Sequence, residues 1–187
     1  MKTRSFLLPL FGLAALLTAG CSTPPASPSA PTEIYTSPAG SAAATEAANI
    51  TVTFNDPEKF TDARSSYSGN TDRGYLDSLT QHLKRMAKQY VKADEKLEVT
   101  FSDVDLAGDF RPGSVQMTDV RLIKEIYRPR MTLTFKLVGA DGKVIKEGAR
   151  TLVDSYFMNN VNLINRDDPL YYDKEMLTTW VRDEFKN

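Results

Sequence analysis

The feature that most constrains the fold is an alternating stretch interrupted by a turn signal. From Met131 to Leu137, apolar residues alternate with Thr and Lys, which is typical of a strand with one buried face. Asp141-Gly142 follows, and this dipeptide favours a tight hairpin turn. Residues Val144 to Val153 then provide the returning strand. The sequence therefore predicts a β-hairpin in the second half of the chain.

The register of this hairpin stays open at the level of sequence. A two-residue turn would pair Lys136 with Glu147, whereas a three-residue turn with a bulge would pair Leu137 with Ile145.

Two earlier segments also predict strands. Asn49–Asn55 and Leu97–Phe101 both alternate apolar with polar residues. After Phe101 the apolar residues change phase, because Val104 and Leu106 now occupy the other parity. Since the two faces of a strand cannot exchange without a bulge or break, we expect an irregularity near Ser102-Asp103.

Two helices are predicted. Asp72–Val91 carries an apolar stripe at helical spacing, and Asp168-Pro169 is typical of the start of a closing helix whose apolar stripe ends at Phe185. Met117–Tyr127 fits either a short helix or a strand. This order of elements predicts an α+β fold over residues 49–187, a single domain in which an antiparallel sheet of about four to five strands has two helices packed on one face.

The N-terminus resembles a bacterial lipoprotein signal over residues 1–20. Lys2 and Arg4 precede the apolar run Phe6–Leu17, which is shorter than a membrane-spanning helix. The small residues before Cys21 resemble a lipobox, which implies that Cys21 carries lipid. Ser22 then implies transfer to the outer membrane, facing the periplasm, if the host is Gram-negative. The alternative is an ordinary secretory signal that leaves no lipid.

Residues 21–48 are rich in Pro, Ser and Ala. Such a composition buries too little apolar surface to offset its chain entropy, so we expect a disordered tether. Removing Lys2 and Arg4 with the signal leaves 21 basic and 24 acidic residues, a net charge of −3, which argues against a nucleic-acid binder.

Three carboxylates are the candidate site residues. Asp103, Asp105 and Asp109, with Gly108, match part of a calcium loop, but Ala107 and Ser114 stand where further ligands belong. The alternatives are carboxylates that cap turns, or an acid and base pair of a hydrolase. We expect no cofactor.

Two further features were weighed. His82 is the one histidine, and its place beside an apolar stripe favours a structural role. The basic residues Arg121, Lys124, Arg128 and Arg130 surround Tyr127, which indicates either an anion-binding patch or dispersed surface charge.

Several motifs, in order, resemble the bacterial family called domain of unknown function 3016. They are Val52–Pro57, Leu97–Phe110, Ile126–Arg130 and Asp168–Leu170 followed by Trp180. Arg128 departs from the pattern, where the family is associated with a second proline. The resemblance implies no activity and no site residue.

These observations favour a non-enzymatic accessory or binding protein of the bacterial envelope, anchored to the membrane through Cys21 and binding an envelope protein. The rival hypotheses are a carboxylate-dependent hydrolase acting on an envelope polymer, and a module that binds calcium or an anionic ligand.

Overall fold

The computed structural model describes residues 32–38, 47–67, 69–110, 120–159 and 167–186. All of them belong to one compact unit, Thr32–Asn187. The unit contains strands β1 (Ile34–Thr36), β2 (Ile50–Asn55), β3 (Lys96–Asp105), β4 (Asp109–Phe110), β5 (Arg121–Leu122), β6 (Arg130–Val138) and β7 (Val144–Val153). Its helices are α2 (Arg73–Ala87) and α3 (Tyr171–Phe185), with short 3-10 turns η1 (Pro57–Lys59) and η2 (Phe157–Asn159).

The predicted α+β class is confirmed. Five strands form one sheet in the order β1-β2-β3-β6-β7, and β4 and β5 form a separate two-stranded sheet. The five-stranded sheet is mostly antiparallel, but β2 and β3 run parallel. The helix α2 lies between them in the chain and provides the crossover that a parallel pair requires.

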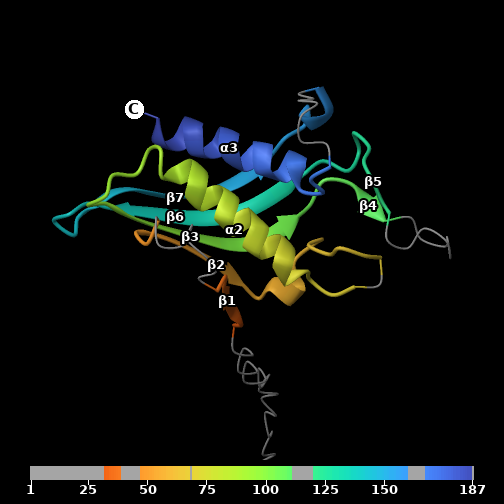
Figure 1. The fold of residues 1–187 in the computed structure, drawn as a ribbon, viewed down its shortest axis with the longest axis horizontal. Helices are drawn as coiled ribbons and strands as arrows, with labels where there is room; N and C mark the ends of the chain where they lie inside the picture. The colour runs from red at the N-terminus through yellow and green to blue at the C-terminus, as the bar shows by residue number, and fades with distance from the viewer. Residues whose placement is uncertain (1–31, 39–46, 68, 111–119, 160–166, 187) are drawn as a thin grey trace, which may run out of the picture. The chain divides into compact units, whose positions relative to one another are not determined.

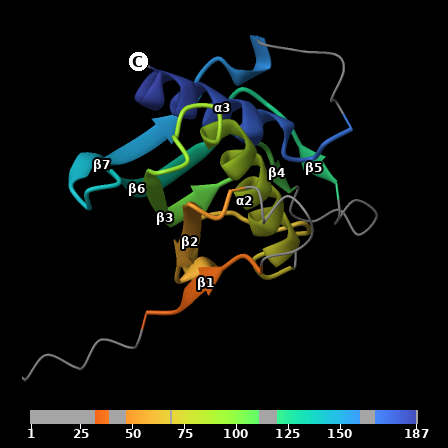
Figure 2. The same ribbon diagram turned by 60° about the vertical axis from the view of Figure 1, so that its left-hand side comes forward.

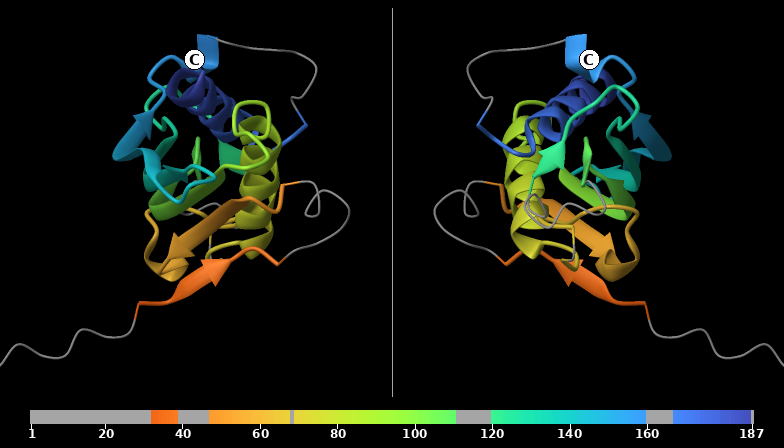
Figure 3. Two further views of the ribbon diagram at one scale, coloured as in Figure 1. Left: turned by 90° about the vertical axis from the view of Figure 1, so that its left-hand side faces the viewer. Right: turned by 90° about the vertical axis from the view of Figure 1, so that its right-hand side faces the viewer.

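Both helices cover the same face of the sheet (Figures 1 and 3). Helix α2 begins where predicted, because the Asp72 carboxylate accepts a hydrogen bond from the amide of Tyr75 and caps it. It ends at Ala87, before the predicted Val91. Helix α3 begins at Tyr171, two residues beyond Pro169. Between the helices and the sheet lies the core, which includes Phe54, Leu76, Leu83, Phe101, Leu133 and Leu177.

The prediction of a disordered segment over residues 21–48 is wrong for Ile34–Thr36. These residues form β1, which pairs antiparallel with β2. The Tyr35 ring lies 6.2 Å from the ring of Phe54, and its hydroxyl donates to Asp77 at 2.7 Å. Tyr35 thus supplies the apolar contact that the surrounding composition lacks. Much of the remaining predicted tether lies outside the described residues.

The irregularity expected near Ser102-Asp103 is present. The β3–β6 register shifts between Phe101 and Asp103. Because of this bulge, Phe101 and Val104 both face the core, while Asp103 and Asp105 lie on the open face.

The hairpin combines the two registers that the sequence left open. Lys136 pairs with Glu147, as the shorter turn predicted. Next to the turn, however, Val138 pairs with Val144, and the amide of Gly139 donates to the carbonyl of Lys143. The turn is therefore one residue longer, and a bulge between these pairs restores the register.

The unit Thr32–Asn187 has the properties of an independently folding domain. It includes every buried apolar residue among those described, and most of these residues form one core cluster. None of the helices in the described ranges is both long and apolar enough to cross a membrane.

Candidate functional site

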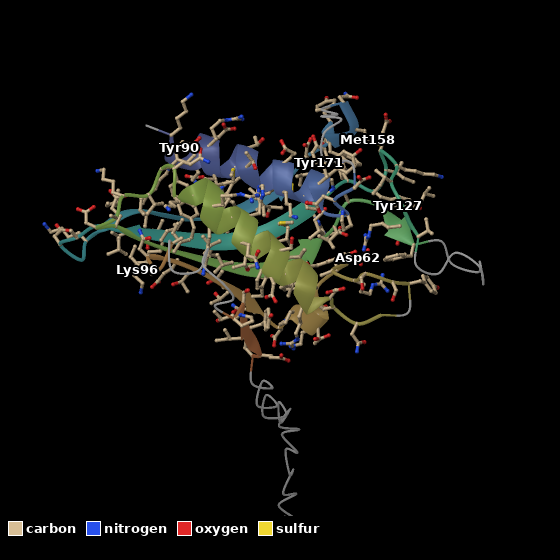
Figure 4. The ribbon with its side chains drawn as sticks, viewed as in Figure 1. Asp62, Tyr90, Lys96, Tyr127, Met158 and Tyr171 are labelled. Atoms are coloured by element: carbon tan, nitrogen blue, oxygen red, sulfur yellow. The ribbon has the colours of Figure 1, made fainter. Side chains whose placement is uncertain are left out.

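A cavity of about 510 Å³ opens at one end of the main sheet, where β3 finishes and β6 begins. We call it the sheet-end cavity. Figure 4 shows Asp62 and Tyr127 at this end of the molecule and Tyr90 and Lys96 at the opposite end. The lining residues share an unusual density of charge, and they are Thr61, Asp62, Arg64, Asp105, Leu106, Gly108, Asp109, Ile126, Tyr127, Arg128 and Arg130.

Backbone pairing places Asp62 against the end of β3. The amide of Asp62 donates to the carbonyl of Val104 at 3.0 Å, and the amide of Leu106 donates to the carbonyl of Asp62 at 2.9 Å. The residue is only 6% exposed. Burying a carboxylate is costly unless a group of opposite charge pairs with it, so we expect a cation beside Asp62.

Arg121 supplies that cation. Its guanidinium nitrogens lie 2.9 and 3.3 Å from the two carboxylate oxygens of Asp62. The same guanidinium donates to the carbonyls of Gly108 at 3.0 Å and Arg64 at 2.7 Å. Its Cζ also lies 4.6 Å from the centre of the Phe110 ring. One side chain therefore connects three segments that are distant in sequence.

Gly108 permits this close approach. Its φ is +87°, a left-handed conformation that favours glycine. A Cβ atom here would lie 2.6 Å from Ile123 Cδ1 and 2.9 Å from Arg121 Cγ. The glycine thus allows β4 and β5 to pack around the Asp62–Arg121 ion pair.

The structure brings two of the three candidate carboxylates into the cavity. Asp105 and Asp109 line it. Asp103, by contrast, accepts hydrogen bonds from the amide and hydroxyl of Thr61 at 2.8 and 2.9 Å, one on each carboxylate oxygen. It therefore fixes the loop of Thr61 to β3, which is the turn-capping role that the sequence allowed.

Asp105 and Asp109 differ in their surroundings. Burial raises the pKa of Asp105, and the neighbouring carboxylate of Asp103 adds to this effect, while Arg130, 3.8 Å away, opposes it. Asp109 accepts a hydrogen bond from the amide of Phe110 at 2.7 Å. Among the described residues, no group of three or more acidic, His or Cys side chains is arranged to hold a metal ion.

Asp173 is a buried carboxylate that the sequence did not single out. This residue of α3 is fully buried, and one of its carboxylate oxygens accepts a hydrogen bond from the amide of Ala107 at 3.1 Å. Its other oxygen has no hydrogen-bond partner among the described residues. Burial raises the pKa of Asp173 to about 7. It joins α3 to the strand end that precedes Gly108.

The basic run divides between two roles. Arg121 points inward, whereas Arg128 and Arg130 line the cavity together with Tyr127. The guanidinium of Arg130 lies 3.7 Å from Asp103 and 3.8 Å from Asp105, and Arg128 makes a 3.4 Å contact with the Ser155 hydroxyl. Because these contacts are long, both guanidinium groups remain able to donate stronger hydrogen bonds to a further partner.

Two large apolar side chains flank these arginines. Ile126, in the cavity wall, and Tyr156, beside Ser155, are each 74% exposed. The amide of Asp154 donates to the carbonyl of Pro129, so the two segments lie side by side. We call Ile126, Tyr127, Arg128 and Tyr156 the cavity rim.

The ambiguous segment Met117–Tyr127 is described from residue 120 onward, where it forms β5 and then a turn.

His82 lies outside this site, between α2 and α3. Arg85 can only donate, so its 3.0 Å contact makes His82 Nδ1 the acceptor, and Nε2 then donates to the Thr178 hydroxyl at 2.8 Å. Burial, with Arg85 and Lys174 nearby, lowers the pKa of His82 to about 4. The expected structural role agrees with these contacts.

A mostly antiparallel sheet with two helices on one face, closed at its end by a buried ion pair, defines a two-layer α+β domain. The chain belongs to the family described as "Protein of unknown function (DUF3016)", whose model matches residues 48–183. The resemblance noted from the motifs is thereby confirmed. No curated protein matches the chain.

Proposed function

We propose that this protein is a membrane-anchored accessory protein of the bacterial envelope that docks a protein partner at the cavity rim. One observation carries the docking proposal. Ile126, which lines the cavity of about 510 Å³ together with Arg128, and Tyr156, whose neighbour Ser155 contacts Arg128, are both 74% exposed. Large apolar and aromatic side chains next to arginine are the residues that dominate the energy of protein interfaces.

The physical advantage of docking at this surface is clear. Covering an exposed aliphatic side chain such as Ile126 contributes about 1.5–3 kcal/mol. The cavity offers Asp105 and Asp109 as well as Arg128 and Arg130, so both signs of charge are available to a partner. A peptide segment that carries both charges and an apolar side chain fits this chemistry better than a simple anion does.

The anchoring proposal rests on the sequence around Cys21. The basic start, the short apolar run and the small residues before Cys21 support lipidation. Two or more acyl chains are needed for stable anchoring, and a lipoprotein cysteine provides them. The chain would then face the periplasm, with the domain of residues 48–183 carried on the segment that follows Cys21.

Mass spectrometry of the mature N-terminus tests the anchor. We expect a diacylglyceryl-modified Cys21, and we expect Cys21→Ala to prevent lipidation and processing at this site. An unmodified N-terminus a few residues from Cys21 would overturn the anchoring proposal but leave the docking proposal standing.

Comparative affinity capture from envelope extracts tests the docking surface. A bait with Ile126→Asp and Arg128→Glu should lose a partner that the unchanged domain retains. Ile34→Asp is the matched control, because Ile34 is 65% exposed but lies on β1 at the far edge of the sheet. Equal retention by all three baits would exclude the cavity rim as the docking surface.

A further inference from the structure

The two edges of the main sheet differ in the length of the strand that they expose. At one edge the three residues of β1 cover β2. At the other edge lies β7, which is ten residues long and contains no proline. Among the described residues, no strand pairs with its outer side. Figure 2 shows β7 and β1 at opposite edges of the sheet. A long strand with unpaired backbone groups is a template for pairing with another chain.

The backbone groups that point outward from β7 can be identified. The amide of Asp154 donates to the carbonyl of Pro129, which makes this a hydrogen-bonded pair of the β6–β7 ladder. Since hydrogen-bonded and non-bonded pairs alternate in an antiparallel ladder, the even-numbered residues of β7 bond to β6. The outward amides and carbonyls therefore belong to the odd-numbered residues Glu147, Ala149, Thr151 and Val153.

The same odd-numbered side chains lie on the open face of the sheet. Leu152 packs against the core, and Lys146 and Arg150 pair with Glu184 of α3 at 2.7 and 2.8 Å, so the even-numbered residues face the helices. These ion pairs hold β7 against α3. The same Arg150 guanidinium also donates to the outward carbonyl of Ala149 at 2.9 Å, and the second lone pair of this carbonyl is left for a donor from another chain. Since the outward amides and carbonyls belong to the odd-numbered residues, an antiparallel second copy must pair its own odd-numbered residues with them. The two copies are then related by a two-fold axis.

One such register matches the side chains well. With the axis at Ala149, this residue meets its own copy, and two small side chains face each other. Glu147 then meets Thr151 of the second copy, and Ile145 meets Val153. The last two are 55% and 45% exposed in the single chain, and pairing would place these apolar side chains beside each other.

We propose that two copies of this chain associate through β7, antiparallel and with the two-fold axis at Ala149, to form one continuous ten-stranded sheet. The proposal does not rest on the docking function. Its interface is β7 itself, whereas the residues of the cavity rim lie outside this strand and β1 is at the opposite edge of the sheet.

Sedimentation of the fragment 32–187 tests the association, since this unit contains its own core. We expect a reversible dimer at concentrations up to about 1 mM. Thr151→Pro removes an outward amide from each copy without touching the ladder to β6, and should raise the dissociation constant at least about tenfold. Thr151→Val keeps the amide and should leave the dimer intact. A monomer at every concentration would overturn the proposal.

Cysteine crosslinking tests the register. The fragment 32–187 contains no cysteine of its own, because Cys21 is the only one in the chain. Ala149→Cys should form a disulfide dimer on oxidation, since the two copies of residue 149 face each other. Thr151→Cys should not, because its two copies would stand four residues apart along the strand, about 13 Å. Equal crosslinking at both positions would contradict this register.

Discussion

Arg121 and Asp62, 59 residues apart in the chain, form an ion pair in which both side chains are nearly buried, at 11% and 8% exposure. The pair joins the segment after η1 to the small β4–β5 sheet. It shapes the sheet-end cavity but is not free to bind a partner, because its hydrogen-bonding capacity is used within the domain. Its role is therefore to position the cavity wall.

Removing one member of this pair should be costly. Arg121→Ala leaves the Asp62 carboxylate buried with only Arg64 nearby, so we expect the free energy of unfolding to fall by about 3–5 kcal/mol. Arg64→Ala is the control and should cost about 1 kcal/mol or less, because its side chain is 34% exposed. Urea denaturation measures both, and similar losses would show that Arg121 does not organise the site.

Gly108 offers a second test of the same wall. Gly108→Ala should lower the free energy of unfolding by about 2–4 kcal/mol, because a Cβ would be 2.6 Å from Ile123 at a φ of +87°. Gly142→Ala is a matched control: its φ is +77°, but nothing lies within 4 Å of the added atom. Thermal unfolding should show a loss of only about 1 kcal/mol there.

The period of the apolar residues explains which parts of the fold were predictable. Strand alternation is a local property, and the change of phase after Phe101 located the β3 bulge to the residue. β1 could not be recognised, because three residues among prolines and serines carry no period, and Tyr35 is ordered by Phe54 and Asp77. The parallel pairing of β2 with β3 likewise depends on how α2 packs.

The candidate site was less predictable, since its central contacts are long-range. Asp62 stands in a polar loop, and nothing near it in sequence indicates that β3 will bury it. Arg121 belonged to a recognised basic run, but its neighbours could not show that it turns inward while Arg128 turns to the cavity. Asp105 and Asp109 were identified as candidates because they cluster, and the bulge at Phe101 brings Asp105 to the open face.

The stability of the domain should depend on His82 at mildly acidic pH. The pKa of His82 is about 4 in the folded state and 6.5 ordinarily. As the pH falls, the unfolded state therefore binds a proton before the folded state does. Relative to His82→Gln, the wild type should lose about 2–3 kcal/mol as pH falls from 6.5 to 4, and no more below that range. Urea denaturation at several pH values measures the difference, and a constant difference would contradict the buried neutral histidine.

Asp173 should have the opposite dependence. Its pKa is about 7 when folded against 3.8 ordinarily, so the folded state holds the proton more tightly. The resulting stabilisation is full below pH 3.8 and is lost as pH rises to 7. Asp173→Asn keeps an acceptor for the Ala107 amide but does not titrate. Relative to this variant, the wild type should therefore lose stability as pH rises, and an unchanged difference would show that Asp173 ionises freely in the fold.

The proposed docking function is tested most directly in the cells that make the protein. A photo-crosslinking amino acid is placed at Ile126 in the full chain and, as a control, at Glu98, which lies exposed to 46% at its side chain on the open face of β3. The docking proposal predicts one reproducible protein adduct from position 126, absent from position 98 and lost when Arg128→Glu is added. Identical adducts from both positions, or none from position 126, would contradict it.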